Sequence, residues 1–203
     1  IILQAVSIFI SKGRSSYLLL LAIVFVFLFL NFKNIYFRTA IIGLPIAASV
    51  IGFFTLPSDL LHKILTGREY LWQSAFRLIA KYPLTGVGNV NKVGRLQDVR
   101  VAYLQGLEAG GLHNIFFEIL CVNGIIATIL FVLLLIFILI FLFKKISKLK
   151  YDDKIKKGLL LSLIVGIIFV NLLESSLIYI ISFISIIFWI YTGYLISLLI
   201  TRD

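Results

Sequence analysis

Long apolar runs separated by shorter polar stretches make up most of this sequence of 203 residues. A run of about 20 residues can cross about 30 Å of hydrocarbon as a helix. Lipid offers no partners for backbone polar groups, and the runs lack the alternation of strands, so we expect helices. The six runs are Ile1–Ile10, Ser16–Leu30, Thr39–Leu56, Asn114–Phe143, Gly158–Leu173 and Leu177–Ile200.

Two of these runs have unusual lengths. Asn114–Phe143 exceeds one span, so we expect its first turns to project above the bilayer or the helix to tilt strongly. Ile1–Ile10 is interpreted as the tail of a span, and the chain, which lacks Met, as the C-terminal part of a longer protein. The prediction is a single integral membrane domain over residues 1–203. It is an all-α, polytopic transmembrane helical bundle, with an amphipathic helix in an outer loop.

The composition agrees with a membrane protein, since 61% of the residues are hydrophobic and only 14% are charged. Basic residues in short loops stay in the cytoplasm, and residues 144–157 hold seven lysines against two aspartates. This Lys-rich loop is therefore predicted to be cytoplasmic, which places the loop 57–113 outside. The net charge of +10 then reflects topology and attraction to membrane lipids. Nucleic-acid binding is disfavoured because the basic residues fall on both sides of the membrane.

The outer loop is predicted to contain a helix. Thr66 and Glu69 have the spacing of a capping box, which makes Thr66 the N-cap. The helix should end at Tyr82, because Pro83 disfavours helical geometry in the residue before it. Residues four apart form a polar face opposite an apolar stripe. The polar face is Glu69, Gln73, Arg77 and Lys81, and the stripe is Trp72, Ala75, Phe76 and Ile79.

Two arginines are candidates for binding an anion. Arg68 falls in the first turn of the predicted helix, where free backbone N–H groups and the helix dipole favour negative charge. A guanidinium there suits a phosphate or diphosphate, and the alternative is a local pair with Glu69 or Asp59. Arg14 lies with Lys12 in a short outer turn, against the positive-inside rule. It is either an interfacial anchor or an anion ligand.

His113 is the candidate proton acceptor, because it precedes a span and imidazole titrates near neutral pH. His62 is a competitor that we interpret as an interfacial residue. Glu118 and Glu174 are acids within or at the mouth of spans, and such residues are functional candidates in a supporting part. The glycines of Gly86–Val87–Gly88 lack the remainder of a nucleotide-binding motif and are expected to form a tight turn. No set of residues has metal-ligand spacing, so no metal site is predicted.

Several short motifs follow one another in a recognisable order. They are Thr66–Gly67–Arg68 with Trp72, Pro83–Leu84–Thr85–Gly86–Val87–Gly88, His113–Asn114 and Asn123–Gly124–Ile125. In order, spacing and predicted membrane side, these motifs resemble the O-antigen ligase and O-antigen polymerase superfamily. Ser11–Lys12–Gly13–Arg14–Ser15 looks like the upstream Ser-Arg element of that superfamily, with a lysine inserted.

The resemblance implies a glycosyltransferase-C-like helical enzyme of the bacterial cytoplasmic (inner) membrane, with its active site facing outward. Its donor would be a polyprenyl-diphosphate-linked oligosaccharide, such as an undecaprenyl diphosphate glycan, and no metal, cofactor or nucleotide sugar would be needed. By position, Arg68 would bind the donor diphosphate, with Arg14 as a second ligand, and His113 would activate the acceptor hydroxyl. Trp72 and Asn114 would also contact substrate.

Three functions stay open at this stage. We favour a polymerase that joins repeat units into O-antigen or capsular polysaccharide, with an acceptor glycan and a chain-length regulator as partners. The first alternative is a ligase that transfers the glycan to a lipid A core in lipopolysaccharide assembly or to another acceptor. The second is a non-enzymatic polysaccharide transporter or flippase. Transporters place polar groups in broken helices at the bilayer midplane, whereas the polar residues here gather in one loop.

Overall fold

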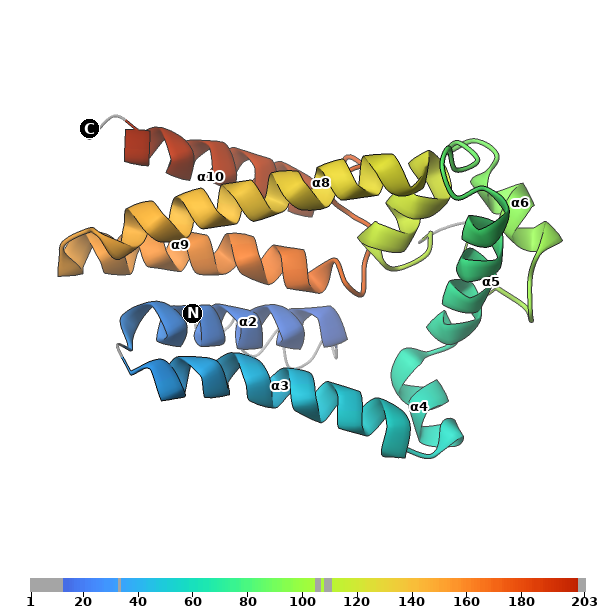
Figure 1. Ribbon diagram of the computed structural model, residues 1–203, viewed down its shortest axis with the longest axis horizontal. Coiled ribbons are helices and arrows are strands. Elements are labelled where there is room, and N and C mark those ends of the chain that lie inside the picture. Colours follow the sequence, from blue (N-terminus) through green and yellow to red (C-terminus); the bar gives the residue numbers. More distant parts are fainter. Residues whose placement is uncertain (1–12, 33, 105–106, 108–110, 201–203) are drawn as a thin grey trace. The chain divides into compact units, whose positions relative to one another are not determined.

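The computed structural model describes residues 13–32, 34–104, 107 and 111–200 (Figure 1). Every regular element in these ranges is a helix, and they contain no strand. The all-α prediction is therefore confirmed for the described part of the chain. The predicted run Ile1–Ile10 lies outside the described residues. The helices are α2 (Arg14–Asn31), α3 (Ile35–Thr55), α4 (Ser58–Leu65), α5 (Arg68–Lys81), α6 (Lys92–Asp98), α8 (Ile115–Ser147), α9 (Tyr151–Val170) and α10 (Phe183–Ile200).

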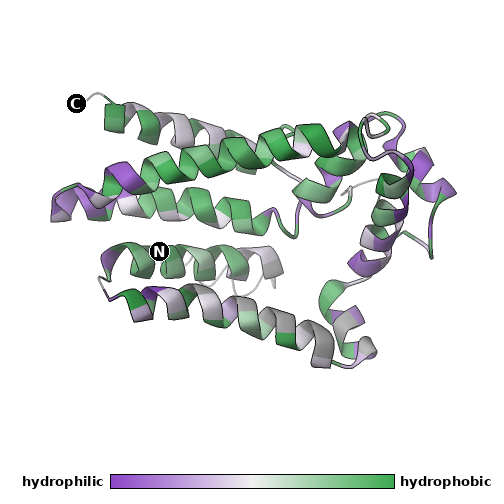
Figure 2. Ribbon diagram, in the orientation of Figure 1, coloured by the Kyte–Doolittle hydropathy of each residue, from purple (hydrophilic) through white to green (hydrophobic). Residues whose placement is uncertain are grey.

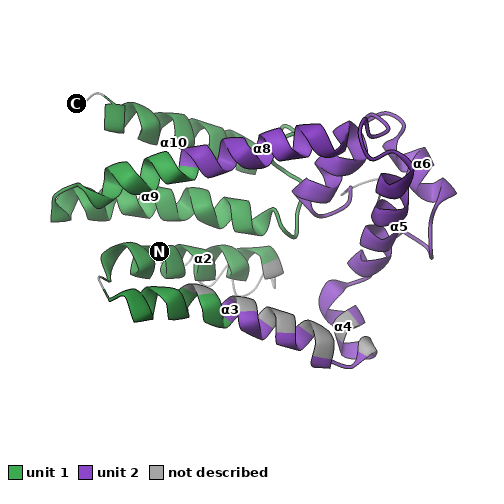
Figure 3. Ribbon diagram, viewed as in Figure 1, with its two compact units in different colours: residues 1–44, 139–203 green, residues 45–138 purple. Residues whose placement is uncertain are grey.

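The chain divides into two compact units, which Figure 3 colours separately. Unit 1 comprises Ile1–Leu44 and Leu139–Asp203, and unit 2 comprises Pro45–Ile138. Helices α3 and α8 each contribute to both units, because the division falls within them. The predicted outer loop 57–113 lies entirely within unit 2.

Unit 1 is built on the contact between α2 and α9. Two glycines of α9 let the helices approach closely, because a Cβ at Gly166 would lie 2.8 Å from Leu19 Cδ1 and one at Gly158 would lie 3.3 Å from Leu30 Cδ1. Small residues serve the same purpose at helix contacts in membrane proteins. Helix α10 also packs on α9, and its Phe188 is fully buried.

Within the described residues, two helices are long and apolar enough to cross a membrane, namely α8 and α10. Figure 2 shows both coloured as hydrophobic over most of their length. Most of α2 and the first part of α3 are shorter apolar helices. The Lys-rich stretch is largely helical, since α8 ends at Ser147 and α9 begins at Tyr151. The multi-span bundle and the cytoplasmic side of this stretch stay predictions.

Helix α8 is broken at Gly124, where φ is 79° and ψ is −176°. The expected single helix over Asn114–Phe143 is therefore interrupted at Gly124, and its projection above the bilayer or its tilt stays a prediction. The segment Pro83–Gly88 pairs with the break through three backbone hydrogen bonds (2.8–2.9 Å). The N–H groups of Val87 and Gly88 donate to the carbonyls of Cys121 and Val122, and Ile125 N–H donates to the Pro83 carbonyl. These bonds satisfy polar groups that the break removes from the helix ladder.

Both glycine motifs are explained by this pairing. A Cβ on Gly86 would clash with the backbone of Val122, and a Cβ on Gly124 would clash with the backbone of Leu84. The glycines of Pro83–Gly88 do turn the chain after α5, as the sequence predicted, since φ is positive at Gly86 and Gly88. Their second task is to let two backbones meet, which no side chain would permit.

The core of unit 2 forms where α5 meets the segments that follow it. Its buried members are Leu71, Ala75, Leu78, Leu96, Val99, Leu104, Leu107, Leu112 and Cys121. The buried face of α5 is thus shifted from the predicted stripe, of which Ala75 alone is fully buried. Trp72 and Ile79 flank the core, and Phe76 is 58% exposed with its ring edge against Phe117. The polar residues Gln73, Arg77 and Lys81 are exposed as predicted.

Candidate functional site

A buried carboxylate organises the part of unit 2 next to His113. Glu118, in the first turn of α8, is only 2% exposed. Its Oε1 accepts a hydrogen bond from Lys92 Nζ at the start of α6, and its Oε2 accepts the Leu112 N–H (2.8 Å). A negative charge in the first turn also suits the dipole of α8. Both oxygens of the carboxylate are therefore occupied by partners from different segments.

The backbone N–H and the carbonyl of Leu112, the residue before His113, both form hydrogen bonds that hold this turn. The Leu112 N–H binds Glu118, and the Leu112 carbonyl accepts the Trp72 indole N–H (2.9 Å). His113 itself has a left-handed backbone, with φ at 49°, which costs a residue other than glycine about 1 kcal/mol. Such a conformation persists only where the surrounding structure imposes it. The contacts of Leu112 provide that restraint.

Asn114 begins α8 as its N-cap. Its Oδ1 accepts the N–H groups of Phe116 and Phe117 (3.0 and 3.1 Å), which would otherwise lack partners in the first turn. The structure thus gives Asn114 a structural task at the site. Trp72 likewise uses its indole N–H on the Leu112 carbonyl, and its ring meets Phe117 edge-on. Substrate contact by these two side chains stays a prediction.

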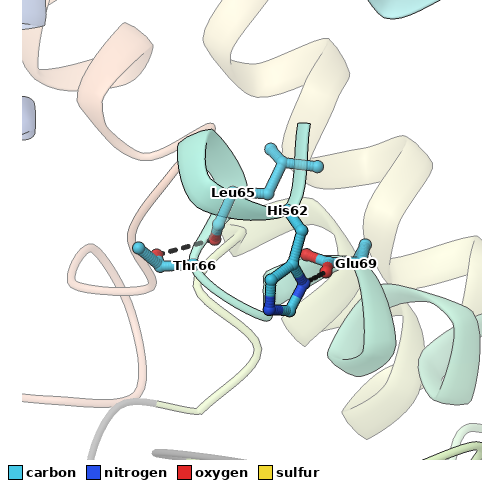
Figure 4. Close-up of polar contacts among 4 residues, drawn as sticks. All are labelled: His62, Leu65, Thr66 and Glu69. Atoms are coloured by element: carbon cyan, nitrogen blue, oxygen red, sulfur yellow. Dashed lines mark hydrogen bonds and ion pairs between the residues drawn. The ribbon is translucent and has the colours of Figure 1, made fainter. Parts of the chain in front are cut away.

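Helix α5 begins at Arg68, one residue after the start that a Thr66 cap predicts, and its cap differs. Thr66 is the C-cap of α4 with a left-handed backbone (φ 55°), and its hydroxyl donates to the Leu65 carbonyl (Figure 4). Gly67 is the N-cap of α5, and no side chain caps the helix. The predicted capping box is therefore wrong. Two successive left-handed residues form a corner between α4 and α5, so the helix starts one residue later than a Thr66 cap would place it.

Glu69 also differs from its predicted part in the capping box. Its Oε1 pairs with Nδ1 of His62 on α4, as Figure 4 shows, and its Oε2 is buried without a hydrogen-bond partner. His62 is exposed, as expected for an interfacial residue, and its ring lies beside Tyr70 (5.7 Å between centroids). The pairing fastens α4 to α5 across the corner. Arg68 is half-buried directly after that corner.

The other two predicted site residues lie in unit 1. Arg14 is the first residue of α2. The neighbouring Ser15 hydroxyl donates to Glu174 Oε1 (2.9 Å), so Glu174 ties the start of α2 to the segment after α9. Glu118 and Glu174 therefore have similar structural roles, since each binds a residue that directly precedes or follows a predicted site residue. Arg68, His113, Trp72, Asn114 and Glu118 all belong to unit 2.

Lys92 is the functional candidate that the sequence reasoning missed. It lies close to Arg95 and Asp98, which are both exposed, and no local pattern in the sequence marks it as buried. Lys92 is only 8% exposed. In the structure it lies at the N-terminus of α6, where a cation opposes the helix dipole. Among the described residues, no group of three or more His, Cys, Asp or Glu side chains could hold a metal ion.

These features define an all-helical chain with two candidate membrane spans and a polar site in which Glu118, Lys92 and Trp72 fix the turn before His113. The O-antigen ligase family model matches residues 1–132, which include every motif described above. The chain therefore belongs to the O-antigen ligase family, and with it to the O-antigen ligase and polymerase superfamily. Members of this family are glycosyltransferase-like, membrane-associated enzymes. No curated protein and no solved structure gives a significant match.

Proposed function

We propose that this protein transfers a glycan from a polyprenyl-diphosphate-linked donor at the outer face of the bacterial cytoplasmic membrane, and that it polymerises oligosaccharide repeat units. The observation that carries the proposal is the hydrogen bond between Trp72 and the Leu112 carbonyl. It joins α5, which begins at Arg68, to the turn that presents His113. Arg68, a cation suited to a diphosphate, and His113, a base suited to a hydroxyl, therefore belong to one structural unit.

The chemistry assigns one task to each residue. The acceptor hydroxyl attacks the anomeric carbon of the donor sugar, the bond from that carbon to the diphosphate oxygen breaks, and polyprenyl diphosphate leaves. A ring nitrogen of His113 accepts the hydroxyl proton, as a histidine acting as general base does. Arg68 pairs with the diphosphate and stabilises the charge that develops on it.

A ligase reaction is the second candidate, because the matching family bears that description. Both reactions share donor, leaving group and base, and they differ only in the acceptor. Because the family consists of enzymes, membership in it favours polymerisation or ligation over the transporter alternative. Incubating purified protein in nanodiscs with lipid-linked repeat units separates the two. A ladder of lengthening products indicates polymerisation, whereas transfer that occurs only when a lipid A core is supplied indicates ligation.

The division of labour is tested by substitution. His113→Ala should reduce turnover by about a hundred- to ten-thousand-fold while leaving binding of a polyprenyl-diphosphate analogue intact. Arg68→Lys should weaken that binding although the charge is kept, because an ammonium cannot offer two parallel donors. Arg77→Lys, on the exposed face of the same helix, is the matched control and should change neither. Normal product formation by correctly inserted His113→Ala protein would refute the assignment.

A further inference from the structure

Lys92 and Glu118 form a buried ion pair that neither the motifs nor the family match assigns to the site. The two residues are 8% and 2% exposed. Burying a carboxylate and an ammonium costs several kcal/mol for each ion, which their mutual attraction repays only with good geometry. Replacing such a pair by apolar residues is frequently neutral for stability, so its presence calls for another reason. The second hydrogen bond of the Glu118 carboxylate supplies such a reason.

The second oxygen of Glu118 holds the turn before His113. It accepts the Leu112 N–H at 2.8 Å, and the chain wraps closely around it. A Cβ on Gly111 would lie 2.9 Å from this same Oε2, so a glycine is needed where the carboxylate reaches the backbone. The position of Lys92 at the start of α6, unfavourable for that helix, is explained if its ammonium serves to hold the Glu118 carboxylate in place.

From this geometry we infer that the buried Lys92–Glu118 pair is a positioning element, which acts through the Leu112 N–H to hold His113 in its left-handed conformation for proton transfer. The inference rests on the proposed function of His113. The connection is continuous in the structure. Lys92 binds Glu118, Glu118 binds the amide of Leu112, and Leu112 directly precedes His113. A base displaced by about 1 Å loses on the order of a hundredfold in rate, so the restraint matters for catalysis.

Two double variants, both uncharged at positions 92 and 118, separate the effect of the hydrogen bond to Leu112 from the effect of the buried charges. Lys92→Gln with Glu118→Gln removes both charges but keeps an oxygen that can accept the Leu112 N–H. Lys92→Met with Glu118→Leu also removes both charges and offers no acceptor. We expect the first pair to retain kcat within about tenfold of the parent. The second should lose about a hundredfold in kcat, with KM for the lipid-linked donor unchanged within about threefold.

Gly111→Ala perturbs the same contact while leaving both charges in place, and it also strains a backbone whose φ is 66°. The added Cβ displaces the Glu118 carboxylate from the Leu112 amide, so kcat should fall as in the apolar pair. Arg95→Gln is the matched control, because it removes an exposed cation from the same helix as Lys92. It should leave kcat and KM unchanged. Gly111→Ala remains informative if the apolar pair fails to fold.

A spectroscopic measurement reports on the turn without reference to catalysis. The chain has two tryptophans, so Trp189→Phe leaves Trp72 as the only one, and its indole N–H binds the Leu112 carbonyl. Emission and acrylamide quenching of Trp72 should change in the Met/Leu pair and in Gly111→Ala but not in the Gln/Gln pair. Equal kcat in the two double variants, or unchanged Trp72 emission in both acceptor-removing variants, would overturn the inference. Normal turnover by His113→Ala would instead refute the proposed function, and the Trp72 comparison would still test the restraint.

Discussion

Replacing Gly124 by alanine should open the site region, because this residue forms the break in α8. Its backbone (φ 79°, ψ −176°) is open almost only to glycine, and a side chain there costs about 1–3 kcal/mol. The added Cβ also clashes with the backbone at Leu84, so the pairing with Pro83–Gly88 must separate. Its three hydrogen bonds contribute about 0.5–1.5 kcal/mol each. The free energy of opening should therefore fall by roughly 3–7 kcal/mol.

The lone cysteine of the chain is placed to measure this opening. Cys121 is 1% exposed, and its carbonyl accepts one of the three bonds. A membrane-permeant maleimide reacts with it only when the region opens. At 1.4 kcal/mol for each factor of ten, Gly124→Ala should raise the labelling rate by about 10² to 10⁵. Gly94→Ala is the control, because a Cβ at that helical position meets nothing within 4 Å.

The sign of the effect distinguishes a broken helix from a continuous one. In an unbroken α8, Gly124→Ala would stabilise the helix by about 1 kcal/mol, since alanine is the better helix former. Labelling of Cys121 would then slow instead of accelerating. A labelling rate at or below that of the parent protein would refute the break and the explanation of both glycine motifs that depends on it.

Two further predictions concern the α4–α5 corner and the topology. Thr66→Gly should raise the free energy of unfolding by about 1 kcal/mol, because it relieves the strain of a left-handed residue. Thr66→Ala should be nearly neutral, because the Thr66 hydroxyl caps no helix. A loss of about 1 kcal/mol in Thr66→Ala would restore the N-cap interpretation. In a Cys121→Ser background, a membrane-impermeant thiol reagent should label Gln97→Cys and not Ser147→Cys in intact cells. The reverse pattern would invert the predicted orientation.

The sequence predicted where helices lie better than how they are joined. Apolar runs indicated the places of α2, α3, α8, α9 and α10, since long hydrophobic stretches leave few alternatives to a helix, although α10 begins at Phe183 and not at the predicted Leu177. The same signal concealed the break at Gly124, because hydropathy is unaffected by one glycine in an apolar run. The break depends on a partner segment about 40 residues earlier, and no local pattern records such a pairing.

The site residues show the same limit. Arg68 and His113 could be singled out because their positions next to a helix start and a span are local properties. Lys92 could not, since a lysine among mixed charges is ordinarily solvated and only the tertiary fold brings it to Glu118, 26 residues away. The capping box failed for a related reason. Thr66 and Glu69 have the right spacing, but the close return of α4 gives Glu69 a partner in His62 instead.

The polar motifs and the glycine motifs together fix α5 against α8. Near its start α5 is tied to the His113 turn by Trp72, and beyond its end Pro83 is tied to α8 by Ile125 N–H. The first section of α8, which carries Glu118, runs between these two ties. The glycines thus fix α5 against the segment that positions His113, although they touch no substrate in the proposed reaction. Substitutions at Gly86 should therefore lower kcat by displacing His113, without requiring any chemical task for the glycine itself.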